Sequence, residues 1–135
     1  MTNEKTINIC GKEVGMLYCA AAETGFEDLS NKSSEIFSPI IEERDADGKP
    51  IKVAKPKANE KDYIYLAIAS IVAYYAKNGS EAPVKTEDIL YDANSQDITN
   101  LIVTVIQLRK EWYKVPAVVK PEMEEKEGDK QEKNA

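Results

Sequence analysis

The chain has 135 residues and a mass of 15.1 kDa, which is the size of one domain, and its 42% of hydrophobic residues suffice for a single core. Its 18 basic and 24 acidic side chains give a net charge of −6, which opposes sequence-independent binding to nucleic-acid phosphates. Histidine is absent, so histidine-dependent catalytic triads and HExxH zinc sites are excluded.

The two cysteines, Cys10 and Cys19, are too few for a four-cysteine zinc site and are not spaced as CxxC. They fit a reduced chain in which both are small hydrophobic residues, and a disulfide between them is the open alternative. The first residues lack the apolar stretch of a secretion signal. The most apolar segment, residues 63–75, is shorter than the roughly 20 residues that span a bilayer. We therefore expect a cytoplasmic protein with no membrane contact, metal or cofactor.

The N-terminal region predicts a hairpin followed by a helix. Residues 6–17 alternate β-branched and polar side chains, and Gly11 supplies a turn, which is typical of a short β-hairpin. The period then changes, and four apolar residues share one helical face: Tyr18, Ala22, Phe26 and Leu29. This pattern predicts a first helix that ends near Asn31.

The next segment, residues 34–58, has no helical period and contains three prolines. Two short stretches in it, residues 40–43 and 51–53, flank an Asp-Gly turn and would pair as a second, small hairpin. An irregular arm is the alternative for this segment.

The best predicted helix runs from Asn59, a typical N-cap residue with an acid three positions later, to a stop at Gly79. Between residues 63 and 75 only Ser70 lies outside the hydrophobic set, so most sides of this helix must be covered. Two interpretations stay open. The helix is either a core element wrapped by its neighbours or an element whose tyrosines cover a partner or a second subunit.

Two further helices are expected. Thr86 would cap a short helix over residues 87–91, and Asn94 and Ser95 would open a long last helix that ends before Pro116. Apolar residues recur in the last helix at three- and four-residue steps: Ile98, Leu101, Ile102, Val105, Leu108 and Trp112. We therefore expect a mainly α fold with a short N-terminal β-hairpin, a small helical domain built on two long helices.

The domain is expected to cover residues 1–119, and residues 120–135 to form a disordered charged tail. Ten of the 16 tail residues are charged, so the tail cannot bury enough apolar area to offset the entropy of ordering. The tail is either a solubilising end or a linker to something outside this chain.

The sequence contains no catalytic constellation. Neither a GxxxxGK[ST] nor a GxGxxG phosphate loop is present, and the acidic pairs lie in loops and at helix starts. We expect a binding protein rather than an enzyme, because the chain has more aromatic and aliphatic surface than a plain amphipathic bundle needs. The candidate partner-binding residues are Tyr63, Tyr74, Tyr75, Trp112 and Tyr113.

Several strings in the chain resemble phage tail assembly chaperones, the G-like proteins of long-tailed phages and prophages. TINICGKEVG resembles the family's opening hairpin, FEDLSNKS is similar to the step after its first helix, and LAIASIVAYY resembles its central helix. Residues 86–90 and 97–113 look like its closing helices. The resemblance covers about residues 5–118. The chain departs from the family at Asn31, where a Gly is expected, and in the segment after Pro39, which is longer than the usual connection.

The resemblance implies a chaperone of the tape measure protein. Such a protein coats apolar helical segments of its client, keeps the client soluble, helps recruit tail tube subunits and is absent from the finished virion. In many relatives a ribosomal frameshift appends a second domain that contacts the tail tube protein, and the charged tail here would end the shorter product. A homo-oligomer is compatible with this role.

The alternative is an acidic helical regulator or adaptor that binds a basic protein surface through charge. Ionic strength separates the two hypotheses, because contacts dominated by charge weaken in salt whereas capture of an apolar client persists.

Overall fold

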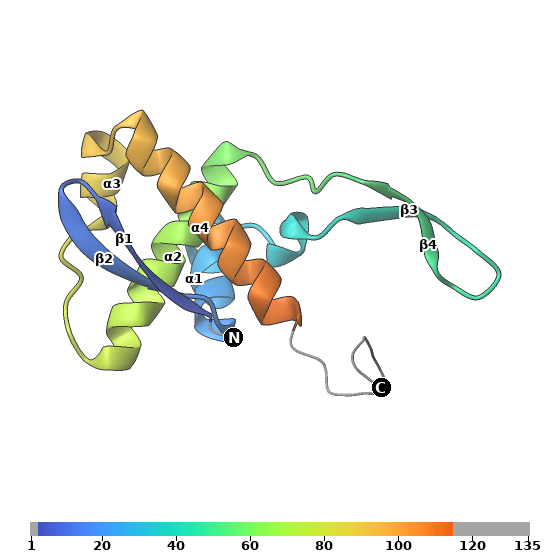
Figure 1. Ribbon diagram of the computed structural model, residues 1–135, viewed down its shortest axis with the longest axis horizontal. Coiled ribbons are helices and arrows are strands. Elements are labelled where there is room, and N and C mark those ends of the chain that lie inside the picture. Colours follow the sequence, from blue (N-terminus) through green and yellow to red (C-terminus); the bar gives the residue numbers. More distant parts are fainter. Residues whose placement is uncertain (1–2, 115–135) are drawn as a thin grey trace, which may run out of the picture.

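The computed structural model describes residues 3–114. Four α-helices and an N-terminal hairpin form a body, and a second hairpin projects from it (Figure 1). The expected fold class, mainly α with a single N-terminal hairpin, is wrong. The described residues form an α/β mixture of four helices and two separate two-stranded antiparallel sheets. The sequence does not separate this second sheet from an irregular arm, because its strands are only five residues long and their pairing contains register shifts.

The first hairpin pairs β1 (Glu4–Ile9) with β2 (Lys12–Leu17). Its turn residues, Cys10 and Gly11, have φ values of 51° and 73°, and positive φ at both central positions is what a two-residue type I′ turn requires. The Cys10 N–H donates a hydrogen bond to Asp97 Oδ2 at 3.2 Å, which ties the turn to the last helix. Both cysteines are free thiols, so the disulfide alternative is not realised.

The strand β2 is buried along most of its length, because it lies against the central helix α2 (Glu60–Asn78). Gly15 meets the ring of Tyr74 so closely that a Cβ atom would not fit. The Gly15 N–H donates to the hydroxyl of Tyr75 at 3.0 Å. Two tyrosines of α2 therefore hold the hairpin in place.

The first helix, α1 (Ala20–Ser30), ends at Asn31, whose φ of 60° is the left-handed conformation that closes many helices. A short 3₁₀ turn, η1 (Ser34–Phe37), follows it. In α2, Asn59 and Asp62 form a reciprocal capping box, and Gly79 closes the helix with a φ of 68°. The predicted start and stop of α2 are thus confirmed.

The last two helices are α3 (Thr86–Asp92) and α4 (Ser95–Lys114). The prediction that Thr86 caps α3 is wrong by one position, because Thr86 is already helical and the extended N-cap residue is Lys85. The Lys85 N–H is satisfied by Asp88 Oδ2 at 2.9 Å. At α4, Asn94 Oδ1 accepts from the Asp97 N–H at 2.8 Å, as expected of a cap.

The core lies between α1, α2, α4 and the first hairpin. Its largest fully buried side chains include Tyr18, Phe26, Ile9, Met16, Leu66 and Leu101. The middle of α2 is buried nearly all round, so this part of α2 is a core helix wrapped by its neighbours.

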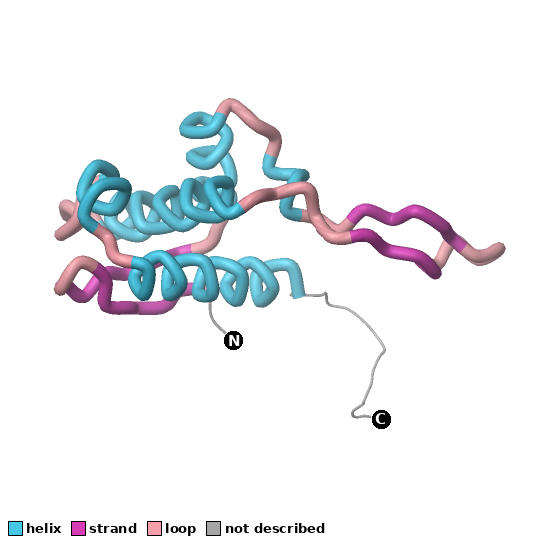
Figure 2. The backbone as a smooth tube through the Cα atoms, turned by 90° about the horizontal axis from the view of Figure 1, so that it is seen from above, coloured by secondary structure: helices cyan, strands magenta, loops and turns pink. Residues whose placement is uncertain are grey.

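The second hairpin pairs β3 (Ile40–Arg44) with β4 (Pro50–Ala54), and we call residues 40–54 the arm. Figures 1 and 2 show the arm extending away from the helices, so no other element covers it. Its turn is held by Asp45, whose Oδ1 accepts from the N–H groups of Asp47 and Lys49, both at 2.9 Å.

Two sequence-based predictions concern the C-terminal tail and contact with a membrane. The expected charged tail, residues 120–135, lies outside the described residues. Within residues 3–114 no helix has both the length and the apolarity needed to cross a bilayer.

Candidate partner-binding surface

The arm presents three exposed apolar side chains close together, two of them on one face. Ile41 and Val53 are direct cross-strand partners, so their side chains lie on the same face of the ribbon. Ile51 lies two positions before Val53 on β4, where the register shifts between the Glu43–Lys52 and Arg44–Pro50 pairs. The exposed fractions of Ile41, Val53 and Ile51 are 41%, 53% and 62%. We call these three residues the arm face.

The opposite side of the arm carries the Ile40–Ala54 pair at its base and charged residues toward its tip. Glu43 pairs with Lys52 in the register, and the Lys52 ammonium also lies 3.8 Å from the Glu42 carboxylate. Arg44 donates to the carbonyl of Gly48 at 2.7 Å near the tip. The arm is thus an amphipathic ribbon, and its charged side keeps it hydrated while the arm face stays uncovered.

Four of the five predicted partner-binding residues are partly buried and make contacts inside the fold. Tyr74 and Tyr75 lie at the C-terminal end of α2 against β2, with their ring centroids 4.8 Å apart. Tyr63 packs on Phe37 at 5.0 Å, near the base of the arm. Trp112 packs on the buried Tyr18 at 5.4 Å. The structure therefore separates the tyrosine pair from the other predicted residues.

Tyr113, the fifth predicted residue, is 54% exposed. Its hydroxyl donates to Glu23 Oε2 at 2.6 Å, and the hydroxyl of Tyr18 donates to the same oxygen at 2.8 Å. Burial and the nearby Glu23 carboxylate raise the pKa of both tyrosines. Both hydroxyls therefore stay protonated near neutral pH and join α4 to α1.

A cleft of about 310 Å³ opens where the arm meets the body. Its apolar walls are Phe37, Pro39, Pro56, Tyr63 and Ile106, and its charged lining residues are Arg109 and Lys110. Pro39 directly precedes β3 and Pro56 follows β4 by two positions, so the cleft lies at the root of both arm strands. We call it the arm-base cleft.

Arg109 has an unusual environment within the arm-base cleft. One of its terminal nitrogens donates to the hydroxyl of Ser38 at 3.0 Å. The guanidinium carbon lies 4.4 Å from the ring centroid of Tyr113 and 6.0 Å from that of Phe37, so two aromatic rings flank the charge. Its Nε–H group is buried and has no hydrogen-bond acceptor among the described residues.

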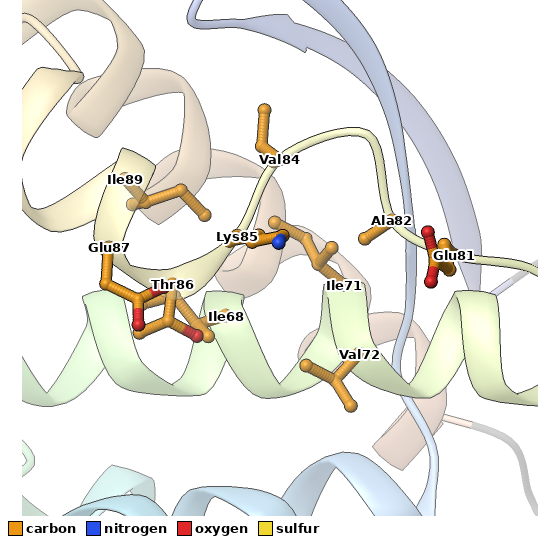
Figure 3. Close-up of a pocket in the computed structure, with 10 residues that line it drawn as sticks. All are labelled: Ile68, Ile71, Val72, Glu81, Ala82, Val84, Lys85, Thr86, Glu87 and Ile89. Carbon is orange, nitrogen blue, oxygen red and sulfur yellow. The ribbon is translucent and has the colours of Figure 1, made fainter.

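A second pocket, of about 360 Å³, lies between α2, α3 and the connection that precedes α3 (Figure 3). Its floor is apolar, and Ile71 of α2 and Ile89 of α3 point into the space between these elements. Charged side chains stand around it on separate segments, including Glu81, Lys85 and Glu87. This pocket is lined mainly by groups that suit an apolar contact.

Sequence reasoning missed the arm face and Arg109. The signal for the arm face was present, because apolar residues flank an Asp-Gly turn, but they were treated as strand formers and not as surface. Within residues 3–114, no three side chains of the His, Cys, Asp or Glu type are grouped so that they would hold a metal ion.

Comparisons of the chain with known proteins identify no relative. The resemblance to tail assembly chaperones therefore rests on the sequence strings quoted above and on their order. The chain matches no protein-family model, and neither a curated protein nor a solved structure matches it significantly.

Proposed function

We propose that this protein is a phage or prophage tail assembly chaperone. In this role it binds the tape measure protein, keeps it soluble and helps recruit tail tube subunits. The sequence resemblance motivates the proposal, and one structural observation supports it best: the arm face is an apolar surface that no part of the described body covers. A projecting apolar ribbon suits a protein whose client is itself apolar.

Covering the arm face would stabilise a complex by the hydrophobic effect. Fully burying one aliphatic side chain contributes about 1.5–3 kcal/mol, and the three residues of the arm face are already partly covered. The association of two chains costs several kcal/mol, so one copy alone would bind weakly. A long client that offers many equivalent segments would compensate, because several copies then bind the same chain.

The overall charge fits the same role. A net charge of −6 makes free copies repel one another, which keeps an apolar surface from driving self-aggregation. The charge on the arm itself is mixed, with acids and bases paired on the side opposite the arm face. Solubility and client capture are therefore assigned to different surfaces of the chain.

Co-expression with the tape measure protein tests the proposal. The wild-type protein should increase the soluble fraction of the tape measure protein, and Val53→Asp on the arm face should reduce this gain several-fold. A matched control is Val103→Asp on α4, because Val103 is 48% exposed and Val53 is 53% exposed. The control should keep most of the gain. A tape measure protein that is equally soluble with and without the wild-type chain would contradict the proposal.

The alternative, an acidic adaptor that binds a basic surface, makes a different prediction for salt. A complex carried by charge should weaken sharply when ionic strength is raised, since the Debye length falls from about 10 Å at 0.1 M to about 3 Å at 1 M. A complex carried by the arm face should persist. Measuring client affinity at both salt concentrations therefore decides between the two.

A further inference from the structure

The arm-base cleft combines apolar walls with two cations that form no ion pair with an acid among residues 3–114. The ion pairs formed among residues 3–114 involve Lys32, Lys52, Lys77 and Lys114. Arg109 and Lys110 form none of them, although the chain carries more acids than bases. Many exposed cations of these residues also form no ion pair, but Arg109 is the one Lys or Arg among residues 3–114 that is partly buried, and it lies beside an apolar cleft with Lys110 next to it.

The acids near the end of α4 are already engaged. Glu23 accepts hydrogen bonds from Tyr18 and Tyr113 at a single oxygen. Glu111 lies 3.5 Å from the ammonium of Lys114, one turn along α4. Neither acid pairs with Arg109, so the positive charge of the arm-base cleft is not neutralised from within the described fold.

Arg109 is held in a fixed orientation before any ligand arrives. Ser38 accepts a hydrogen bond from one terminal nitrogen, and the rings of Tyr113 and Phe37 flank the guanidinium plane. A side chain that is already ordered loses little entropy on binding. Its buried Nε–H lacks an acceptor, and an unpaired buried donor is a cost that an incoming acceptor would remove.

We propose that the arm-base cleft binds an acidic side chain of a partner segment in which that acid neighbours apolar residues. The inference rests on the proposed chaperone function and specifies which stretches of the client are recognised. The apolar walls take the neighbouring apolar side chain, while Lys110 and the guanidinium of Arg109 take the carboxylate. Arginine pairs with a carboxylate most strongly side-on, through two parallel N–H groups, and a Lys ammonium offers no such pair.

The arm-base cleft adjoins the arm, so the two can form one continuous binding surface. Pro39 and Pro56 belong to the cleft and lead directly into the two arm strands. A client segment anchored by its acid in the cleft would continue along the arm face. The cleft would set the register of the client, and the arm face would add apolar contact.

Long-range electrostatics sharpen this proposal. The net charge of −6 disfavours an acidic ligand over a neutral one of the same shape. A preference for an acidic segment must therefore come from local cations, and Arg109 and Lys110 are the local cations of the arm-base cleft.

Two synthetic helical peptides test the inference. Both have about 18 residues, long enough for measurable helix, and are built from Leu, Ala and Gln on an amphipathic pattern. They differ only in that three Gln residues beside the apolar face are replaced by Glu in one of them. Fluorescence anisotropy with the full-length protein should show about tenfold tighter binding of the Glu peptide, because a carboxylate forms charge-assisted hydrogen bonds that an amide does not.

Variants locate the preference. Lys110→Gln removes one cation whose side chain is exposed and makes no contact that the fold requires, and Arg109→Lys keeps the charge but loses the side-on geometry. Both should bring the Glu to Gln affinity ratio close to one. Lys12→Gln is the matched control, because Lys12 is an exposed cation at the start of β2 and does not line the arm-base cleft. Figure 1 shows the first hairpin on the far side of the helices from the arm. This control should keep the ratio.

Equal binding of the two peptides, binding of neither, or an unchanged ratio in Lys110→Gln would overturn the inference. The co-expression experiment gives an independent result. If the wild-type chain solubilises the tape measure protein but does not distinguish the peptides, only the role assigned to the cleft fails. If it does not solubilise the tape measure protein, the chaperone function itself fails.

Discussion

The body and the arm contain the same kinds of apolar residues, but the body buries them and the arm exposes them. Ile9, Ile71 and Val105 are almost completely buried in the body, whereas Ile51 and Val53 are more than half exposed in the arm. Both regions contain an antiparallel hairpin, but only the first packs against helices. The contrast shows that a turn and β-branched residues suffice to define a ribbon, while burial depends on what the rest of the chain brings to it. The arm's apolar residues therefore contribute little burial to the described fold.

The largest expected effect compares one residue from each region. Phe26→Ala should destabilise the protein by about 3–5 kcal/mol, because Phe26 is fully buried and packs edge-on against Phe37. Ile51→Ala should change the free energy of unfolding by less than about 0.5 kcal/mol, because its side chain is largely exposed. Urea denaturation of both variants gives the two values. Similar losses would mean that the arm belongs to the cooperative core.

A smaller effect is expected at Asp62, which is buried within α2's capping box. Its carboxylate lies 2.9 Å from the Lys32 ammonium and accepts from the Asn59 N–H at 3.0 Å. Burial alone would raise the pKa of Asp62, but the Asn59 hydrogen bond and Lys32 outweigh burial and lower it. Asp62→Asn should therefore cost about 1–2 kcal/mol at pH 7, where the ionised form makes both contacts.

The pH dependence of this effect has a defined sign. Because the folded state lowers the pKa of Asp62, the stabilisation is complete above the unfolded pKa, about 3.9, and is lost as the pH falls through the lower folded value. Unfolding measured between pH 6 and about 2 should show a smaller acid-induced loss in Asp62→Asn than in the wild type. Glu60→Gln, an exposed acid in the same helical turn, is the control. Parallel curves for wild type and Asp62→Asn would contradict the assignment.

The smallest effect is expected for Tyr113→Phe, which removes the hydrogen bond to Glu23. We expect a loss of at most about 1 kcal/mol, since the side chain is half exposed. Burial and Glu23 raise the pKa of Tyr113, so its contribution is complete below the unfolded pKa of about 10 and declines as the pH rises through the folded value. Thermal unfolding between pH 8 and about 11 should show less alkaline destabilisation in the variant. An identical alkaline loss would remove this role from Tyr113.

Features set by local chemistry were predictable from the sequence. Asn59 and Gly79 delimit α2 because caps depend on a few neighbouring residues and on backbone freedom. The start of α3 was misplaced by one residue, since both Lys85 and Thr86 precede acids that can satisfy the first helical N–H groups. The arm stayed ambiguous because each strand has only five residues and β3 begins with two adjacent isoleucines, so the alternation is too short to separate a hairpin from an irregular arm.

The site residues were harder to predict because their roles depend on distant parts of the chain. Arg109 acquires its orientation from Ser38 and Phe37, about 70 positions away. Tyr74 was expected on a partner surface, but its ring lies against Gly15 of β2. An aromatic residue favours both cores and interfaces, so composition alone does not assign it to one of them.

The two hairpins limit strand addition at their edges in different ways. The Gly15 N–H donates its hydrogen bond to the hydroxyl of Tyr75, so this donor of β2 is not free to pair with an added strand. The arm interrupts its own ladder instead, with register shifts around Glu43 and a proline at the start of β4. At high local concentration these features would oppose edge-to-edge strand pairing between copies. The apolar side chains of the arm would still be exposed.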